Sequence, residues 1–298
     1  MRITEGRIAY DILNSVNNAR EKIVDLQGQL ASGKRVQKVS DDPAASETIM
    51  RLQASLDRNT QYQKNVSDAQ GFVDSASSSL DDLNSLLTQV QEILVQAENG
   101  QQTSAVVALG NQVDGILQQA VSIANTQFNG KTLFGGTQTT TTPYALTTNP
   151  GPPATTTVTY SGNSGAITYA VGDGATQQVN TSGANAFGGT ALFDLLIRVR
   201  DNLQAGTLPS AADQAAVKTS AATLMAAAGK LGTYSQSLTT TSTHLQSQET
   251  QLQSLMSSTR DTDVAEATLD LTNRQTMLNA ALQTAAKILP PSLLDYLS

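Results

Sequence analysis

The chain contains no cysteine and no tryptophan, a single histidine, and aromatic residues at only 4% of its length. The absence of cysteine excludes disulfides, thiol catalysis and thiolate-ligated zinc. His244 is the one histidine, so the sequence offers few candidate residues for a histidine-rich metal site or for a Ser-His-Asp triad. Few large aromatic side chains also argue against the compact core that an enzyme usually has. We therefore expect no catalytic site, no metal and no cofactor.

Basic residues and long apolar runs are scarce as well. The 298-residue chain has 18 Lys and Arg against 25 Asp and Glu, for a formal charge of -7. Such an acidic chain lacks the basic stripe that neutralises phosphates, so we expect no nucleic-acid partner. The chain has no run of about 20 apolar residues, the length that would predict a transmembrane helix. Residues 1–6 lack the apolar region of a cleavable signal peptide, so export would need a route without one.

What the chain does contain is heptad-spaced apolar residues near both ends. Near the N-terminus they recur at alternating steps of four and three, and near the C-terminus they recur every seven residues. This spacing is typical of helices that pack along other helices, so we expect residues 8–32 to pair with residues 264–289. The seam residues are Ile12, Val16, Ala19, Ile23, Leu26, Leu30, Val264, Leu271, Leu278, Ala285 and Ile288.

The first helix should be followed by a turn and two long antiparallel helical segments. The turn is Ser40, Asp41, Asp42 and Pro43. Asp42 can cap the next helix, and Pro43 suits its first position because no hydrogen bond is lost there. Heptad spacing then continues to about residue 97, and a second long helix should follow a capping box at Ser210. We expect residues 45–127 to pair with residues 210–258.

The intervening region, residues 137–190, is rich in Thr, Pro and Gly and has no helical period. Residues 157–160 and 166–171 are β-type runs, and we expect them to form a hairpin around residues 161–165. A turn at residues 172–174 should lead to one more strand. A Thr-rich insertion of this kind is more often an outer shell than a ligand site.

Together these patterns predict a mainly α protein: a long antiparallel heptad-patterned helical rod with paired terminal helices and a small β-rich insertion domain. We assign residues 1–44 and 260–298 to a terminal coiled-coil assembly domain. The rod takes residues 45–136 and 191–259, and the outer insertion takes residues 137–190. Packing the terminal seams buries little apolar surface, whereas ordering the backbone of these helices costs conformational entropy. We therefore expect the ends to be largely disordered in the free monomer and to fold on assembly.

Several stretches carry a family resemblance. Residues 30–45, LASGKRVQKVSDDPAA, resemble the segment that joins the first two helices of the flagellin superfamily, and residues 128–136, FNGKTLFGG, resemble its rod tip. The opening, MRITEG, resembles the branch found at the junction of hook and filament rather than the filament flagellins. The same branch is indicated by the C-terminal motif Pro291, Ser292, Leu293, Leu294, Asp295, Tyr296 and Leu297.

The resemblance implies a structural adaptor of the bacterial flagellum, assembled as a homo-oligomeric ring between the hook-associated protein FlgK and the flagellin filament. It also implies an extracellular protein, exported by the flagellar type III apparatus without a cleaved signal peptide. A flagellar export chaperone would bind the C-terminal region, and the helical termini would form the inner tube.

Two alternatives stay open. The chain could be flagellin itself, and self-polymerisation of the purified protein would then be expected. It could also be a surface adhesin acting through residues 137–190, which a glycan-binding screen would reveal.

Overall fold

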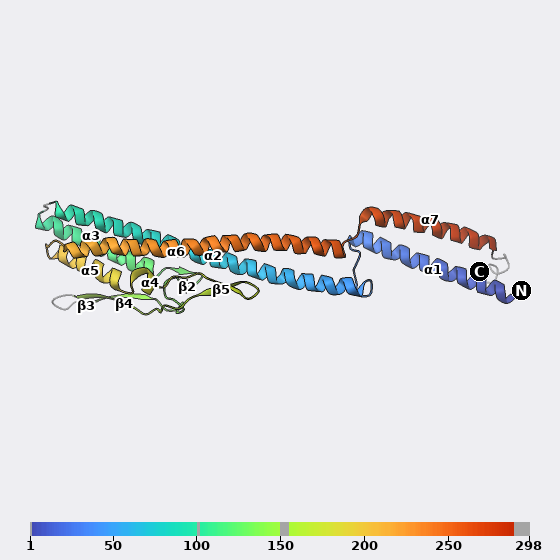
Figure 1. Ribbon diagram of the computed structural model, residues 1–298, viewed down its shortest axis with the longest axis horizontal. Helices are drawn as coiled ribbons and strands as arrows, with labels where there is room; N and C mark the ends of the chain where they lie inside the picture. The colour runs from blue at the N-terminus through green and yellow to red at the C-terminus, as the bar shows by residue number, and fades with distance from the viewer. Residues whose placement is uncertain (1, 100–101, 150–154, 289–298) are drawn as a thin grey trace. The chain divides into compact units, whose positions relative to one another are not determined.

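The computed structural model describes residues 2–99, 102–149 and 155–288 (Figure 1). It divides into two compact units: unit 1 is Met1–Arg58 with Glu249–Ser298, and unit 2 is Asn59–Gln248. Long helices dominate, together with three two-stranded antiparallel sheets, so the predicted fold class is confirmed. The helices are α1 (Arg2–Ser32), α2 (Pro43–Glu98), α3 (Thr103–Ala124), α4 (Gly183–Phe187), α5 (Ala191–Gln204), α6 (Ala211–Arg260) and α7 (Val264–Ile288). The strands are β1 (Gln127–Phe128), β2 (Lys131–Thr132), β3 (Tyr144–Asn149), β4 (Thr155–Tyr160), β5 (Thr168–Gly172) and β6 (Ala175–Gln178).

The two longest helices begin where the sequence predicts. α2 starts at Pro43, and Asp42 Oδ1 accepts a hydrogen bond from the backbone N–H of Ala45 at 2.9 Å. α6 starts directly after Ser210, whose hydroxyl accepts from the N–H of Asp213 at 3.1 Å and donates to its carboxylate at 2.8 Å. Both caps satisfy N–H groups that the start of a helix leaves without a partner.

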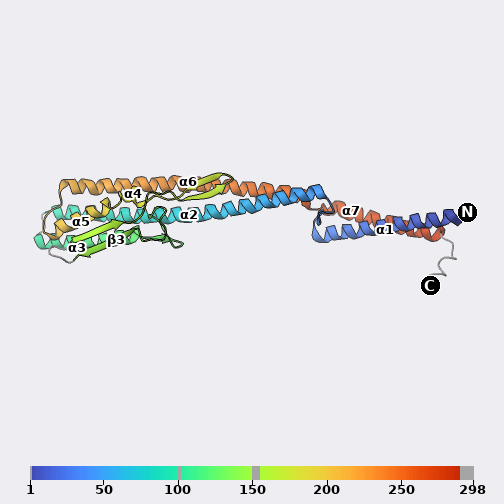
Figure 2. The same ribbon diagram turned by 90° about the horizontal axis from the view of Figure 1, so that it is seen from below.

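Within unit 2, α2 and α6 run antiparallel, as their heptad patterns predict (Figure 2). Gln214 Nε2 donates to Glu98 Oε1 at 2.5 Å towards one end, and Asn59 Nδ2 donates to the Leu245 carbonyl at 3.1 Å towards the other. Asn59 is 3% exposed and also donates to the side chain of Gln248. A buried amide of this kind favours one register, because another alignment would leave it unpaired.

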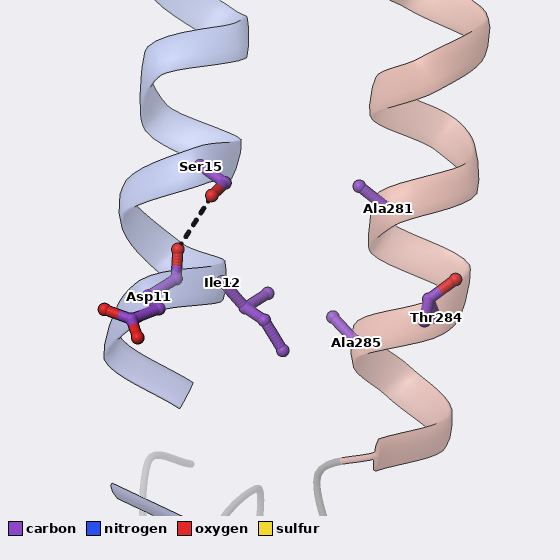
Figure 3. A pocket seen from close by; sticks show the side chains of 6 residues that line it. All are labelled: Asp11, Ile12, Ser15, Ala281, Thr284 and Ala285. Carbon is purple, nitrogen blue, oxygen red and sulfur yellow. Dashed lines mark hydrogen bonds between the residues drawn. The ribbon is translucent and has the colours of Figure 1, made fainter. Parts of the chain in front are cut away.

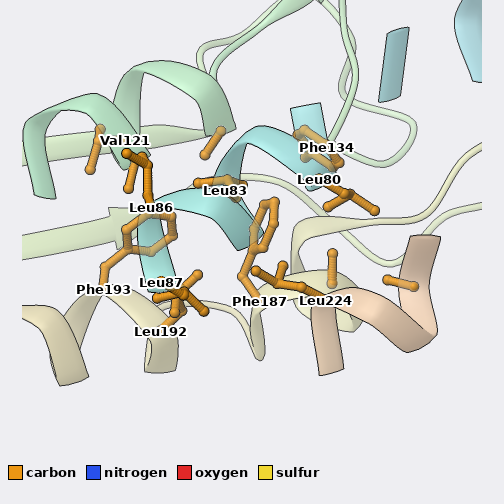
Figure 4. Packing of buried hydrophobic residues seen from close by; sticks show 14 of the residues in the cluster. Leu80, Leu83, Leu86, Leu87, Val121, Phe134, Phe187, Leu192, Phe193 and Leu224 are labelled. Atoms are coloured by element: carbon orange, nitrogen blue, oxygen red, sulfur yellow. The ribbon is translucent and has the colours of Figure 1, made fainter. Parts of the chain in front are cut away.

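The main hydrophobic cluster of the described residues lies entirely in unit 2, between Val66 and Leu245. Leucines of α2 face aromatic rings contributed by α4 and α5 (Figure 4). The rings of Phe187 and Phe193 both pack against Tyr144, with centroids 5.8 and 4.8 Å away. The few aromatic residues of the chain are thus concentrated where the strands meet the helices, which gives this unit a well-packed core.

The strand pairing differs from the predicted one. β3 pairs with β4, and β5 pairs with β6, so the predicted hairpin around residues 161–165 is wrong. Those residues instead form a loop: Asn163 Oδ1 accepts from the N–H groups of Thr137 and Gly165, both at 2.9 Å. The loop also packs so closely on the Tyr160 ring that a Cβ on Gly162 would lie 2.5 Å from it. The predicted turn at residues 172–174 does join two strands, β5 and β6.

Within residues 2–99, 102–149 and 155–288, no helix is both long and apolar enough to cross a membrane. No group of three or more His, Asp or Glu side chains in those ranges is arranged to hold a metal ion.

Candidate assembly surface

The terminal helices α1 and α7 pack side by side in unit 1, the pairing that the heptads predict (Figure 1). Val16 and Ile23 of α1 are 6% and 8% exposed, and Ala285 of α7 is 9% exposed. Val264, at the start of α7, is 59% exposed, and Ala267 is the buried residue one turn later. The remaining described seam residues are half-buried: Ile12, Ala19, Leu26, Leu30, Leu271 and Leu278. The side chain of Ile288 and the whole motif Pro291–Leu297 lie outside the described residues.

Unit 1 exposes large apolar side chains that its own fold leaves uncovered. The described residues include thirteen such side chains, and ten belong to unit 1, although it holds fewer residues than unit 2. On α1 they are Tyr10, Leu13 and Val24, at 65%, 57% and 64% exposed, which we call the second stripe. Leu13 and Val24 each follow a seam residue by one position, so they lie about 100° farther round the helix.

Sequence reasoning missed the second stripe. Its members fall at the positions of the first seam shifted by one residue, but Asn17 and Arg20 occupy the shifted positions between Leu13 and Val24. The interrupted spacing therefore gives only a weak signal in the sequence. On α7, Leu269 and Met277 are also 67% and 69% exposed. The terminal helices therefore carry apolar surface on faces beyond the one that joins them.

A groove with a volume of about 430 Å³ opens between α1 and α7 (Figure 3). Ile12 points from α1 towards Ala285, and Ala281 faces the same space from α7. Because α7 places alanines here, its side chains are too short to fill the space beside α1. The complete lining is Asp11, Ile12, Ser15, Ala281, Thr284 and Ala285.

The connector, residues 33–42, joins α1 to α2 and is hydrogen-bonded to the joint between α6 and α7. The backbone N–H of Arg35 donates to the Arg260 carbonyl at 2.8 Å. Its guanidinium donates to the Thr259 carbonyl at 2.9 Å. Ser40, in the same segment, is exposed. Sequence reasoning noted Arg35 only as part of a basic stretch, because a backbone acceptor so far along the chain leaves no local signal.

Two carboxylates organise the predicted Ser-Asp-Asp-Pro turn. The backbone N–H groups of Lys38 and Gln37 donate to Asp41 Oδ2 at 2.9 and 3.0 Å, and they lower the pKa of Asp41 below its usual value. The N–H of Ala45 likewise lowers the pKa of Asp42. Because the pKa values of both carboxyls are lowered, both are ionised at neutral pH, and the turn is held in its geometry by charged acceptors.

Comparison with known proteins places these helices in a family. Residues 5–139 match the model of the bacterial flagellin N-terminal helical region, and residues 214–297 match that of the C-terminal helical region. Together the two matches cover more than half of the chain and include both α1 and α7. The chain therefore belongs to the flagellin superfamily, with both the N-terminal and the C-terminal helical region of that family.

Individual relatives agree with this class. Flagellar hook-associated protein 3 from Salmonella typhimurium is 28% identical over 189 residues, 63% of this chain and 57% of that protein. Flagellin 1 from Proteus mirabilis is 26% identical over 125 residues, 41% of this chain and 34% of that protein. The chain thus spans little more than half the length of the first relative and about a third of the second.

A solved structure shows the same fold. The structure described as a flagellar hook-associated protein from Vibrio parahaemolyticus has a TM-score of 0.64 to this chain at 20% identity. The match covers 74% of this chain and 100% of the other. The family resemblance carried by residues 30–45 and 128–136 is confirmed.

Proposed function

We propose that this chain is the structural adaptor of the hook–filament junction, assembled as a homo-oligomeric ring between the hook-associated protein FlgK and the flagellin filament. The observation that carries the proposal is the uncovered apolar surface of unit 1. Exposed large apolar side chains concentrated in one unit favour an interaction surface there, because burying them against a partner is favourable. The Salmonella relative, a hook-associated protein, supports the junction as the place of assembly.

The proposal assigns a role to each part of the chain. Residues 1–44 and 260–298 form the assembly domain and the inner tube, and residues 45–136 with 191–259 form the rod that faces neighbours in the shell. Residues 137–190 are an outer insertion. Export through the flagellar type III apparatus without a cleaved signal peptide, with a chaperone on the C-terminal region, belongs to the same proposal and makes the protein extracellular.

Deletion of the gene tests this function. The deletion strain should be non-motile, with intact hooks and with flagellin shed into the medium, and the wild-type gene should restore its filaments. Normal filaments in the deletion strain would overturn the proposal.

A matched pair of variants connects the test to the surface that motivates it. Met277 in unit 1 and Met225 in unit 2 are the same residue type and are 69% and 63% exposed. Met277→Ser should complement the deletion poorly because it removes apolar contact area from the assembly surface. Met225→Ser should complement it fully.

Filament flagellin is the second candidate, favoured by the match to Flagellin 1 of Proteus mirabilis. The two candidates differ in what the purified protein does by itself. A flagellin should elongate seeds into long filaments, whereas a junction adaptor should add to hook ends and stop. Electron microscopy of seeded mixtures separates the two results.

A further inference from the structure

The C-terminal end of α6 accepts hydrogen bonds from the connector, a distant part of the chain. A helix leaves its last backbone carbonyls without partners of its own. Here the Arg260 carbonyl accepts from the backbone N–H groups of Arg35 and Val36 at 2.8 and 3.3 Å. The Thr259 carbonyl accepts from Arg35 Nη2 at 2.9 Å. Arg35 thus places a cation where the helix dipole puts partial negative charge.

The same guanidinium reaches the start of α2. Arg35 Nη1 lies 3.3 Å from Asp42 Oδ2, while Asp42 Oδ1 accepts from the Ala45 N–H and so caps α2. A guanidinium presents its donors in a planar fork, so one arginine can bond two acceptors at once. Arg35 and Asp42 therefore connect the end of α6 to the start of α2, and each charge lies at the helix end that its sign favours.

These bonds to helix ends distinguish the contact from an ordinary surface ion pair. The Arg35 and Asp42 side chains are 48% and 35% exposed, and a pair so accessible to water contributes little by its charges alone. Removing Arg35, however, also leaves the last carbonyls of α6 without this donor. We therefore expect its loss to affect more than one ion pair.

The segments that lead out of α1 and into α7 are bonded to each other beside this contact. The Thr262 N–H donates to the Gly33 carbonyl at 3.0 Å, and Lys34 and Asp261 form an isolated antiparallel β-bridge. Arg35 follows Lys34 directly in the chain. The place where α1 ends and α7 begins in unit 1 is therefore tied to the attachment of Arg35.

We propose that Arg35 is a positioning residue for assembly: it fastens the adjoining ends of α1 and α7 to the end of α6 and, through Asp42, to the start of α2. We call the bonds of Arg35 to Thr259, Arg260 and Asp42 the clasp. The inference rests on the proposed function, because α1 and α7 carry the assembly surface. Without the clasp, that surface keeps its apolar residues but is no longer held in one place relative to the adjoining ends of α2 and α6.

Complementation of the deletion strain tests the clasp, with filament-bearing cells counted by electron microscopy. Arg35→Ala should lower their number about tenfold or more, because it removes charge-assisted hydrogen bonds at two helix ends. The amount of variant exported and the thermal melt of unit 2 should equal those of the native chain. Arg51→Ala is the matched control: it breaks an exposed ion pair with Glu47 on α2, 3.9 Å long, and should complement fully.

Exchanging the two charges separates the clasp from a simple ion pair. Arg35→Asp combined with Asp42→Arg keeps opposite charges together, so it would restore a simple pair. In the clasp, the exchanged charges face the wrong helix ends: a carboxylate meets the carbonyls of α6, and a guanidinium meets the first N–H groups of α2. The double variant should therefore be as defective as Arg35→Ala.

A disulfide should replace the clasp, and the native chain has no cysteine that could interfere. The two residues of an antiparallel bridge have Cα atoms about 4.5–5.5 Å apart, which suits a disulfide. Lys34→Cys with Asp261→Cys, added to Arg35→Ala, should recover most filaments when cells grow with an oxidant, and a reductant should abolish the recovery. The same cysteine pair beside the native Arg35 should also form the bond. Mass spectrometry of isolated flagella, after alkylation of free thiols, detects it.

The outcomes separate this inference from the function on which it rests. Loss in Arg35→Ala, failure of the charge exchange and recovery through the disulfide together support the clasp. Full complementation by Arg35→Ala or by the charge exchange overturns it, and so does reduced export or a lower unit 2 melt in Arg35→Ala. Free thiols in the flagella of the cysteine pair, or a bond that forms without recovering filaments, also overturn it. All of these results leave the junction function intact, whereas normal filaments in the deletion strain would refute that function.

Discussion

Unit 1 and unit 2 are built from the same kind of heptad helix, but they cover their seams to different degrees. Leu83 and Leu87 of α2 and Leu231 of α6 are 0–1% exposed, whereas Val16 and Ile23 of α1 are 6% and 8% exposed. In unit 2 the long helices also pack against α3, α5 and the aromatic residues around the strands. In unit 1, α1 has α7 along its length and retains the uncovered second stripe. A heptad helix therefore becomes self-sufficient only when several elements surround it.

Amide hydrogen exchange should show the largest difference between the two units. Core amides of α2 and α6 in unit 2 should exchange only on global unfolding, which typically requires about 5–15 kcal/mol. Amides of residues 8–32 should exchange through local opening at much lower cost, because few side chains around them are fully buried. Mass spectrometry on the purified monomer measures both sets. Strong protection of residues 8–32 before assembly would contradict the expectation that the termini fold on assembly.

Replacing a buried aromatic side chain by alanine should strongly lower the stability of unit 2. Phe193 is 0% exposed and packs against Tyr144 and Phe187. Phe193→Ala should reduce the free energy of unfolding by about 3–5 kcal/mol, measured by chemical denaturation. Tyr10→Ala in unit 1 is the control: its ring is 65% exposed, so stability should change by about 0.5 kcal/mol or less. Equal losses in the two variants would mean that the units do not differ as described.

A helix-breaking substitution should separate assembly from the stability of unit 2. Ile23→Pro removes a helical hydrogen bond in α1 and costs about 3 kcal/mol or more. Incorporation into flagella should be lost, while the thermal melt of unit 2 stays where it is. Ile23→Val, which keeps the helix, should retain incorporation. A lower melting temperature for unit 2 in the proline variant would show that the two units unfold together.

Acidification should have the smallest effect, limited to the connector of unit 1 and to Asp261 at the joint between α6 and α7, whose pKa is lowered by hydrogen bonds to Ser257 and Arg260. Hydrogen bonds to the ionised carboxylates lower the pKa values of Asp41 and Asp42 below the ordinary value of 3.8. A lowered pKa in the folded state adds stability above the unfolded pKa, and that stability is lost as the pH falls through the folded value. The amide resonances of Lys38 and Ala45 should therefore shift as the pH drops below about 4. Asp41→Asn should abolish the response at Lys38 and leave that at Ala45.

The starts of α2 and α6 could be predicted from sequence, but the strand pairing could not. Asp42 and Ser210 act on N–H groups within one helical turn, so their capping roles depend only on nearby residues. A β-run such as β4 can pair through either edge, and nothing in its own residues says which neighbour it takes. The structure pairs β4 with β3, where Tyr144 lies opposite Tyr160 and reaches the aromatic core. The prediction paired it with the following run instead.

The sequence by itself determined the heptad seams, the starts of α2 and α6 and the family, because each depends on residue spacing within a few turns. It did not give the start of α1 at Arg2, which the spacing predicts at residue 8, or the short helix α4 within the predicted β-rich insertion. Only the tertiary structure showed which apolar faces are covered. Leu13 of the second stripe and Val16 of the first seam are both apolar residues of α1, yet Leu13 is 57% exposed while Val16 is 6% exposed. An apolar stripe is stabilised by any complementary surface, so its spacing does not say whether that surface belongs to the same chain. That depends on residues more than two hundred positions away, at α7.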